Sequence, residues 1–330
     1  MPVASAPGKV YLFGEHAVVY GEPAIPCAIN RRVTVDVQPR ADEYVHIETD
    51  AVNVMRGTVT VPFDDSSDPA LCVPTAQLTK GTAYVIEALQ QVFSYLNEGA
   101  TGFDITIESE LPVGAGLGSS AAVSVATVTA AAHAFEAKLS DEMIAQLAYQ
   151  TEQAVQSGRA SRADTFCATM GGAVRVEGDD CQSISAPPLS FTIGFDGTAG
   201  DTGKLVQAVE KLVDTYVFGD TLIAAIGSIV REGEDQLAAN DRRAVGSLMN
   251  INHGLLAALG VSTASLDEMV WAARSGGAAG AKLTGAGGGG CIVALGNDPG
   301  ITTALSVVAS CDHAFSTDIA TEGIMRPEEP

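Results

Sequence analysis

The sequence predicts an α+β protein built from two domains. The chain has 330 residues, which exceeds the size of most single domains. Short β-rich runs fall between longer stretches with helical periodicity, so strands and helices are expected in both halves. The polar stretch at residues 179–190 contains two prolines and is typical of a junction. We therefore expect one domain over residues 1–186 and another over residues 187–330.

The first half contains strands and helices in mixed order. We expect strands at residues 8–13, 33–40, 44–50, 101–109 and 171–178, and helices at residues 75–97, 119–137 and 140–157. The second of these helices is apolar nearly all round, which is typical of a helix buried at the centre of a domain. The third begins at Ser140, a plausible cap, with Asp141 and Glu142 in its first turn. Residues 50–74 are irregular and leave open a loop near a site or a plain surface excursion.

The second half is expected to begin with a strand and to continue as a run of helices. The strand covers residues 191–196, and the helices cover residues 203–217, 219–238, 241–259 and 263–276. Two more strands flank a glycine-rich turn within residues 281–295, and a final pair of elements follows residue 299. No internal repeat is visible.

The charge balance excludes one class of partner. Forty Asp and Glu residues against eighteen Lys and Arg residues give a formal net charge of −22. Such a surface repels polyanions, so we expect no nucleic-acid partner and no membrane partner. Only six of the cations are lysine, and an acidic, lysine-poor surface is one way to stay soluble at high salt, so we expect a salt-adapted host. Any phosphate site must then act through local donors and a divalent cation.

Other features indicate a cytoplasmic protein. Apolar residues make up 46% of the chain, yet no apolar run is long enough to span a bilayer, and the first residues lack the features of a signal peptide. The six cysteines are scattered without a CxxC pair, which predicts reduced and mostly buried thiols. Cys311 and His313 could pair on a metal, but chance neighbours explain them more simply.

A glycine-broken loop, PVGAGLGSSAA at residues 112–122, predicts a phosphate site. Gly114, Gly116 and Gly118 allow positive φ and close approach of a ligand to the backbone. Ser119 and Ser120 then open a helix, where unpaired N–H groups and the helix dipole favour an anion. The alternative is an ordinary turn from strand to helix with a serine cap.

The segment APGKVYLFGEHAVVYG at residues 6–21 ends its strand in polar groups. Within the strand, Lys9 and Tyr11 lie on one face because side chains alternate. A surface lysine over an aromatic ring would explain that arrangement equally well. Glu15 and His16 directly follow a glycine, and they could bind a polar substrate, although a lone histidine is more often structural.

Two carboxylates in the next segments are candidates for chemistry. Glu152 lies on the same stripe of its helix as Ile144 and Ala148, so it is expected either to find a cation or donor, or to turn outward near the helix end. Asp164 follows in the small-residue loop GRASRAD, where it could act on a ligand or cap the turn.

The segment KLTGAGGGGC at residues 282–291 has five glycines in six positions. So much backbone freedom is costly to order, which indicates close approach to another backbone or to a ligand, with a wide hairpin turn as the alternative. A dinucleotide-binding loop would lie in the first βα unit, so this position argues against a dehydrogenase.

In this order and at these separations, the three glycine-containing segments resemble the motifs of the GHMP small-molecule kinases. The resemblance covers residues 4 to about 296, and the ending EHAVVYG is similar to the family members that phosphorylate mevalonate. It implies an N-terminal α/β domain of the ribosomal S5 domain 2-like type, a C-terminal ferredoxin-like domain, and an ATP site between them. The expected domain boundary near residue 186 agrees with that organisation.

The resemblance also implies roles for individual residues. The phosphates of ATP would be bound by Pro112, Gly114, Ala115, Gly116, Leu117, Gly118, Ser119 and Ser120. Ser120 and Glu152 would be ligands of Mg²⁺, and Asp164 with Lys9 would be catalytic. Mevalonate would be contacted by Lys9, Glu15, His16, Asp164 and Thr202, and the supporting glycine loop would use Gly285, Gly287 and Gly288.

The implied activity is ATP-dependent phosphorylation of (R)-mevalonate at its 5-hydroxyl, with ATP and Mg²⁺ as cofactors and a homodimer as the expected assembly. Three alternatives stay open: a sister enzyme that phosphorylates phosphomevalonate, a decarboxylase of a phosphorylated mevalonate, and a sensor that binds nucleotide without transfer. Arg159 and Arg162 keep the first alternative open, because a doubly anionic substrate requires extra basic residues.

The sequence departs from the family pattern at two places. Ser161, Arg162 and Ala163 stand where a Ser-Gly pair is common, so Arg162 could add charge near the phosphates. The spacing from Glu152 to Asp164 is also one residue longer than usual. Without a bulge at the helix end, Gln153 would take the ligand position instead of Glu152.

Overall fold

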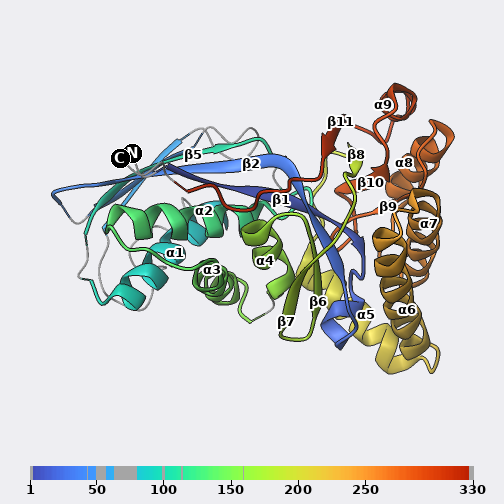
Figure 1. Cartoon of the computed structure of the whole chain (residues 1–330), viewed down its shortest axis with the longest axis horizontal. Coiled ribbons are helices and arrows are strands. Elements are labelled where there is room, and N and C mark those ends of the chain that lie inside the picture. Colours follow the sequence, from blue (N-terminus) through green and yellow to red (C-terminus); the bar gives the residue numbers. More distant parts are fainter. Residues whose placement is uncertain are drawn as a thin grey trace.

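The computed structural model describes residues 3–42, 44–49, 57–62, 80–98, 101–112, 114–158 and 160–326. Two sheets organise this part of the chain, and helices cover one face of each (Figure 1). The predicted α+β class is confirmed.

The first sheet has seven described strands in the order β4-β3-β5-β2-β6-β7, and β1 pairs with β2 outside this path. Its strands are β1 Val3–Phe13, β2 Ile25–Pro39, β3 Tyr44–Thr49, β4 Gly57–Pro62, β5 Phe103–Ser109, β6 Ala173–Glu177 and β7 Asp180–Ile184. The helical elements of this lobe are η1 Ala17–Tyr20, α1 Lys80–Leu96, α2 Ser119–Ala134, α3 Asp141–Val155 and α4 Arg162–Met170. Only β3 and β5 pair in parallel; the other described pairs are antiparallel.

The second sheet is antiparallel, in the order β11-β8-β10-β9. Its strands are β8 Ser190–Phe195, β9 Ala281–Leu283, β10 Cys291–Leu295 and β11 His313–Asp318. The helices of this lobe are α5 Thr202–Thr215, α6 Gly219–Ala238, α7 Arg242–Ala258, α8 Ala264–Ser275 and α9 Pro299–Ser306. No single helix in the described ranges is long and apolar enough to cross a membrane; α5 and α6 pass only as a pair, and they meet at a bend of 118°.

Helix α2 forms the centre of the first lobe, as its composition predicts. It packs against β1, β2, α1 and α3, and its small side chains let these neighbours approach closely. Most of its residues from Ala121 to Ala132 are buried. Helix α3 is capped as expected, because the Ser140 side chain accepts a hydrogen bond from the Met143 N–H at 3.2 Å. The loop before α2 lies against the second lobe, because a Cβ at Gly116 would be 3.1 Å from the Thr284 carbonyl oxygen.

The path of the chain differs from the prediction in three places. Asp164 lies in the first turn of α4, not in a loop, because Ser161 caps a short helix that the small-residue composition conceals. Residues 180–184, expected to be junction, form β7 and complete a hairpin with β6. Within residues 50–74, residues 57–62 form β4, and the remainder lies outside the described residues.

The chain passes from the first sheet to the second between Ile184 and Ser190, the interval of the expected boundary. After β11 it returns to the first sheet, where Ile319 pairs with Ile29 and Met325 pairs with Ser5. Residues 319–326 therefore pack on the N-terminal sheet, which differs from the assignment of all residues after 186 to the second domain.

Helix α6 joins the two lobes. Gly227 and Gly233 lack side chains where it crosses the N-terminal segment; a Cβ at Gly233 would lie 2.5 Å from the Phe13 ring. Arg231 of this helix pairs with Glu22 at 2.8 Å. The C-terminal end of β1 is thus fixed against the second lobe.

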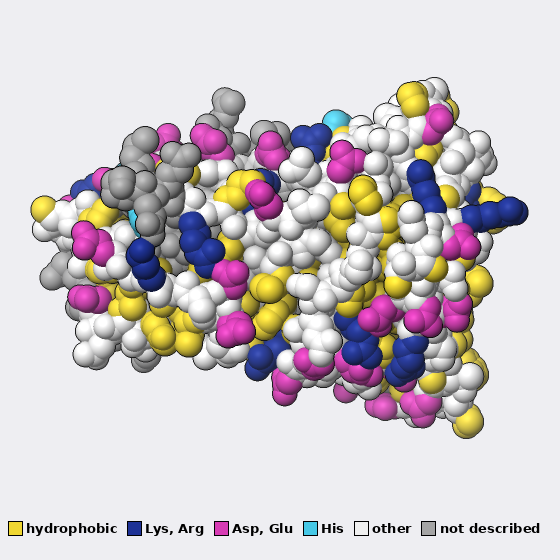
Figure 2. Space-filling view, in the orientation of Figure 1, with side chains coloured by type: hydrophobic (Ala, Val, Ile, Leu, Met, Phe, Trp, Pro, Cys, Tyr) yellow, Lys and Arg dark blue, Asp and Glu magenta, His cyan; other side chains and the backbone are white. Residues whose placement is uncertain are grey.

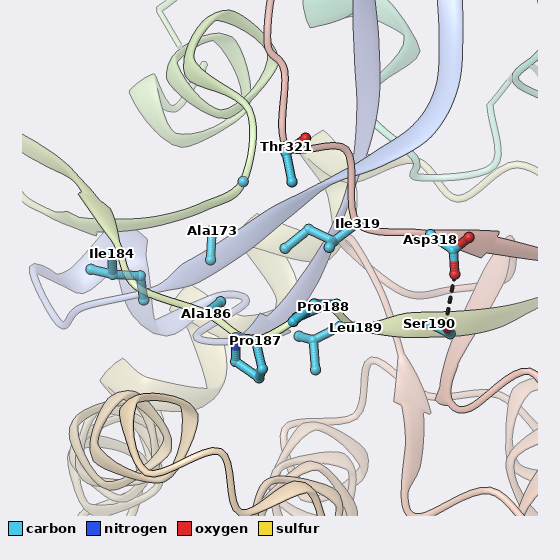
Figure 3. Close-up of a pocket in the computed structure, with 11 residues that line it drawn as sticks. Ala173, Ile184, Ala186, Pro187, Pro188, Leu189, Ser190, Asp318, Ile319 and Thr321 are labelled. Atoms are coloured by element: carbon cyan, nitrogen blue, oxygen red, sulfur yellow. Dashed lines mark hydrogen bonds between the residues drawn. The ribbon is translucent and has the colours of Figure 1, made fainter.

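A cavity of about 490 Å³ lies between the linker and the returning tail (Figure 3). Ala186, Pro187 and Ile319 give it apolar walls, and Ser190 donates to Asp318 at its rim over 2.7 Å. It contains none of the predicted site residues, so it is separate from the candidate active site.

The five described cysteines are free, and Cys27, Cys167 and Cys291 are buried, as expected. Cys72 lies outside the described residues. Cys311 donates to the His313 carbonyl oxygen at 3.4 Å, and no cluster of three or more His, Cys, Asp or Glu side chains suited to a metal occurs in the described ranges.

Candidate active site

The phosphate loop has the backbone that its glycines predict. Gly114, Gly116 and Gly118 have φ values of 73°, 79° and 72°, in the left-handed region that favours glycine. Gly118 is the N-cap of α2, and no side chain caps the helix. The alternative of a serine-capped turn is therefore wrong: the N-cap residue is a glycine without a side-chain acceptor, so the first N–H groups of α2 are suited to an anion.

The loop lies directly over Lys9. A Cβ at Gly118 would be 2.8 Å from the Lys9 Cγ, so only glycine leaves room for the lysine stem. The Lys9 ammonium donates to the Gly116 carbonyl oxygen at 3.3 Å and lies 4.4 Å from the centre of the Tyr11 ring. Lys9 is only 3% exposed, so it is not the surface lysine of the alternative interpretation.

Asp164 completes this arrangement from α4. Its Oδ2 lies 3.3 Å from the Lys9 Nζ, and its Oδ1 accepts a hydrogen bond from the Tyr11 hydroxyl at 2.9 Å. The Asp164 side chain keeps 25% exposure, whereas that of Lys9 has 4%. Burial and the Asp164 charge raise the Tyr11 pKa well above its ordinary value, so the hydroxyl stays a donor. The carboxylate is thus held from two sides and open on the third.

Glu152 is buried near the same point. Its Oε2 accepts from the Gln156 Nε2 at 3.0 Å, whereas its Oε1 has no hydrogen-bond partner among the described residues. Burial raises its pKa to about 7, and the Asp164 charge adds to this rise, while Ser120 and Lys9 oppose it. A bound cation would stabilise the ionised form of this buried carboxylate.

The longer spacing between α3 and α4 does not displace Glu152. The chain leaves α3 through a turn in which Ser157 and Gly158 have positive φ. The Gln153 amide instead donates to the Tyr149 hydroxyl at 2.6 Å and to the Ala160 carbonyl oxygen at 2.9 Å. Gln153 therefore faces the connecting turn, away from the position that Glu152 occupies.

Ser120 and Glu152 fit a magnesium ion chemically. A hydroxyl and a buried carboxylate with one unpartnered oxygen are the hard oxygen donors that Mg²⁺ prefers, and Mg²⁺ commonly takes its other ligands from phosphates and water. Tyr84 of α1 also interacts with Ser120, and its pKa is raised to about 12 by burial and by the Glu152 charge. Its hydroxyl therefore stays protonated beside the two candidate ligands.

A second set of contacts joins the end of β1 to the glycine loop at residues 285–290. Glu15 forms a buried ion pair with Lys282, and the His16 Nε2 lies 2.8 Å from the Ala286 carbonyl oxygen. The Tyr11 N–H donates to the Thr284 Oγ1 at 2.9 Å. His16 has a φ of 62°, and burial lowers its pKa. We call the contacting residues of the segments 6–21 and 282–291 the seam. They are Tyr11, Glu15, His16, Lys282, Thr284 and Ala286.

The glycine loop is the turn of the antiparallel β9–β10 hairpin, as the hairpin alternative predicts, and it also approaches the phosphate loop closely, as the other interpretation predicts. A Cβ at Gly285 would lie 3.2 Å from the Gly116 Cα. Gly287 and Gly288 have φ values of 83° and 71°, and a Cβ at Gly287 would lie 2.1 Å from the Val261 carbonyl oxygen. These glycines let two backbones pack at van der Waals distance.

Thr202 is the first residue of α5, after the cap Asp201, and it is exposed. Its loop abuts both glycine segments, because Gly200 packs on Gly287 and Ala199 packs on Gly114. No hydrogen bond joins Thr202 to Lys9 or Glu15 within the described residues.

Comparisons with known proteins agree on the kind of protein. The GHMP kinases N terminal domain matches residues 83–172, the GHMP kinases C terminal domain matches residues 234–305, and the galactokinase galactose-binding signature matches residues 2–39. Mevalonate kinase of Pyrococcus furiosus is 38% identical over 98% of this chain and 97% of its own length. The chain belongs to the mevalonate kinase family of the GHMP kinases.

Solved structures of the mevalonate kinase family share the fold over nearly the whole chain. The Methanococcus jannaschii mevalonate kinase is 28% identical, with a TM-score of 0.80 over 96% of this chain and 98% of that one. The L. major mevalonate kinase in complex with R-mevalonate is 26% identical, with a TM-score of 0.77 over 96% of this chain and 94% of that one. The predicted family and two-lobe GHMP fold are confirmed.

One expectation about charge is wrong. The guanidinium group of Arg162 lies 3.2 Å from the Asp179 Oδ1, donates to the Gln146 Oε1 and stacks over the Tyr149 ring at 4.8 Å. Because Arg162 and Asp164 are two residues apart on a helix, their side chains point in different directions. Arg162 therefore binds α3 and the β6–β7 hairpin and adds no charge at the phosphate loop. Arg159 lies outside the described residues.

Sequence reasoning missed two members of the site, Tyr84 and Lys282. Tyr84 belongs to a helix without a motif, and nothing local marks its hydroxyl. Lys282 did carry a signal: it is a lysine within an otherwise apolar strand, between Ala281 and Leu283, in a chain with few lysines. A charge in such a strand is retained only where a partner compensates it.

Proposed function

We propose that this chain transfers the γ-phosphoryl group of ATP to the 5-hydroxyl of (R)-mevalonate. The observation that carries the proposal is the Lys9–Asp164 pair, which lies beneath the phosphate loop with one carboxylate face open. Family membership at 38% identity to a mevalonate kinase supports the choice of substrate. ATP would bind with its β- and γ-phosphates at the N-terminus of α2.

Each residue then has a role in an in-line transfer. Asp164 accepts the proton of the 5-hydroxyl. The hydroxyl oxygen forms a bond to the γ-phosphorus of ATP while the bond from that phosphorus to the oxygen of the leaving ADP breaks. Tyr11 and Lys9 hold the carboxylate in place, and the Lys9 charge stabilises the developing alkoxide. Ser120 and Glu152 would hold Mg²⁺, which supplies charge neutralisation of the phosphates when bound. Glu15, His16 and Thr202 would orient mevalonate.

The charge of the chain is consistent with this arrangement. Acidic side chains are spread over both lobes, with Lys and Arg beside several of them (Figure 2). A net charge of −22 does not attract ATP at long range, so binding has to come from the loop N–H groups, Lys9 and the metal. A homodimer and a cytoplasmic location stay predictions.

The test is an ADP-release assay with purified protein, ATP and Mg²⁺, offering mevalonate, phosphomevalonate, galactose and homoserine in parallel. We expect turnover with mevalonate and formation of 5-phosphomevalonate without CO₂. Turnover of galactose instead would favour the galactose-binding signature at residues 2–39 as the better guide. Release of CO₂ from a phosphorylated mevalonate would indicate the decarboxylase, and nucleotide binding without ADP release would indicate the sensor.

A further inference from the structure

Lys282 is a lysine without access to solvent. It lies at the middle of β9, and its side chain is 0% exposed. Its ammonium group donates to the Glu15 Oε1, to the Leu283 carbonyl oxygen at 2.8 Å and to the Tyr11 carbonyl oxygen at 3.4 Å. An ammonium group has three N–H donors, so the chain itself occupies all of them. Lys282 therefore has no donor left for a substrate carboxylate or phosphate.

Glu15, its partner, has one oxygen bound and one free. The Oε1 accepts from Lys282, whereas the Oε2 is buried and has no hydrogen-bond partner among the described residues. Burial raises the Glu15 pKa, and Lys282 opposes that rise. A buried carboxylate oxygen without a donor is costly, so a donor brought by a bound molecule is stabilised there.

Glu15 lies near the proposed reacting groups, because the Lys9 charge lowers the Glu15 pKa and the Glu15 charge raises the Tyr11 pKa. Glu15 follows β1, the strand that carries Lys9 and Tyr11, and the seam holds the end of that strand against the glycine loop. Asp164 is already engaged by Lys9 and Tyr11 at the point where the reacting hydroxyl binds. A second hydroxyl of the same substrate is the group left to meet the Glu15 Oε2.

We propose that Lys282 is a positioning residue for substrate recognition: it holds Glu15 ionised, with the Oε2 presented to a non-reacting hydroxyl of the alcohol substrate. The inference rests on the proposed function and adds a residue to it. The pair is neutral as a whole, so an anionic substrate such as mevalonate approaches Glu15 without repulsion. An alcohol without a second hydroxyl would leave the Oε2 unpaired and would bind weakly.

A double-mutant cycle tests this role with Glu15→Gln, Lys282→Met and the variant carrying both. Lys211→Met, at an exposed lysine of α5, is the matched control. For each protein, KM for mevalonate, KM for ATP and kcat are measured, and thermal unfolding verifies the fold. The double variant carries neutral side chains of similar size, so the test does not depend on Lys282→Met folding alone.

We expect Glu15→Gln to raise KM for mevalonate at least about tenfold, with KM for ATP changed less than about twofold. Adding Lys282→Met to Glu15→Gln should change KM for mevalonate by less than about threefold, because Lys282 acts only through the carboxylate. A larger further loss, or a matching rise in KM for ATP, would overturn the proposal. Wild-type protein that phosphorylates a different alcohol contradicts only the proposed function, and the cycle then applies to that alcohol.

Discussion

Two lysine–carboxylate pairs each have one member in the segment 6–21, and the pairs differ in their exposure to solvent. Lys9 and Asp164 pair over 3.3 Å, and the Asp164 side chain keeps 25% exposure. Lys282 and Glu15 pair in the seam with side-chain exposures of 0% and 2%. A group that exchanges a proton with a substrate must be reachable, whereas a group that defines a binding position gains from exclusion of water. The proposed roles follow this difference: proton transfer at the exposed Lys9–Asp164 pair and substrate positioning at the buried Lys282–Glu15 pair.

The largest effect is expected from Asp164→Asn, which changes the more exposed of the two pairs. We expect kcat to fall about a thousandfold, because the amide cannot accept the hydroxyl proton, while ATP binding persists. Steady-state ADP release and nucleotide titration measure the two effects. Asp179→Asn, at an exposed carboxylate that pairs with Arg162, is the control and should keep wild-type turnover. An Asp164→Asn enzyme with an unchanged rate would show that the open pair is not the reactive one.

The next largest effect is expected at the metal position. Glu152→Gln should raise the Mg²⁺ concentration required for half-maximal rate at least about tenfold, because it removes the charged ligand. Mg²⁺ titration of ADP release measures this. Gln153→Ala is the neighbouring control, since the Gln153 amide is engaged by Tyr149 and Ala160. If Gln153→Ala raised the required Mg²⁺ concentration more than Glu152→Gln did, residue 153 and not Glu152 would be the metal ligand.

A smaller effect tests the contact between the phosphate loop and Lys9. Gly118→Ala places a Cβ against the lysine stem, so kcat should fall about tenfold as the ammonium shifts from Asp164. Gly178→Ala is the matched control: it has a φ of 59° but open space at the Cβ position. Both variants should lose about 1–2 kcal/mol in the free energy of unfolding, from the strained backbone alone. Equal kcat values for the two variants would show that the contact between Gly118 and Lys9 does not affect catalysis.

The last prediction concerns stability at the strand that carries Lys282. The His253 Nδ1 accepts from the Leu283 N–H at 3.3 Å, and its Nε2 lies 3.1 Å from the Asp267 Oδ1. Burial lowers the His253 pKa to about 4, although Asp267 opposes this. The unfolded chain therefore takes up a proton first as pH falls below about 6.5, and stability is lost between about 6.5 and 4.

From this shift we expect the free energy of unfolding to decrease by about 2–3 kcal/mol across that window through His253. His253→Gln, which cannot titrate, should show a shallower decrease. Urea unfolding at several pH values measures the difference, and parallel slopes for the two proteins would contradict it.

The sequence predicted much of this molecule for local reasons. Glycines spaced through residues 112–122 predicted left-handed turns before a helix, and the apolar composition of α2 predicted its burial. The stripe on α3 left open whether Glu152 faces inward or turns outward near the helix end, and in the structure it is buried. By contrast, α4 was missed because it is only nine residues long and mixes β-branched, polar and apolar residues, so no helical period is visible until Ser161 caps the turn and Cys167 is buried.

The sequence by itself determined the family, the α+β class and the motif residues, because periodicity and glycine placement act over short stretches of chain. The family resemblance implied that Lys9 and Asp164 act together, whereas tertiary structure alone decided that Lys282 meets Glu15. Lys9 meets Asp164 and Lys282 meets Glu15 across separations of more than a hundred residues, and only the packing of β1 between α4 and β9 brings them together. It also turned Arg162 away and placed Tyr84 beside Ser120, since burial selects contacts by position in space and not by distance along the chain.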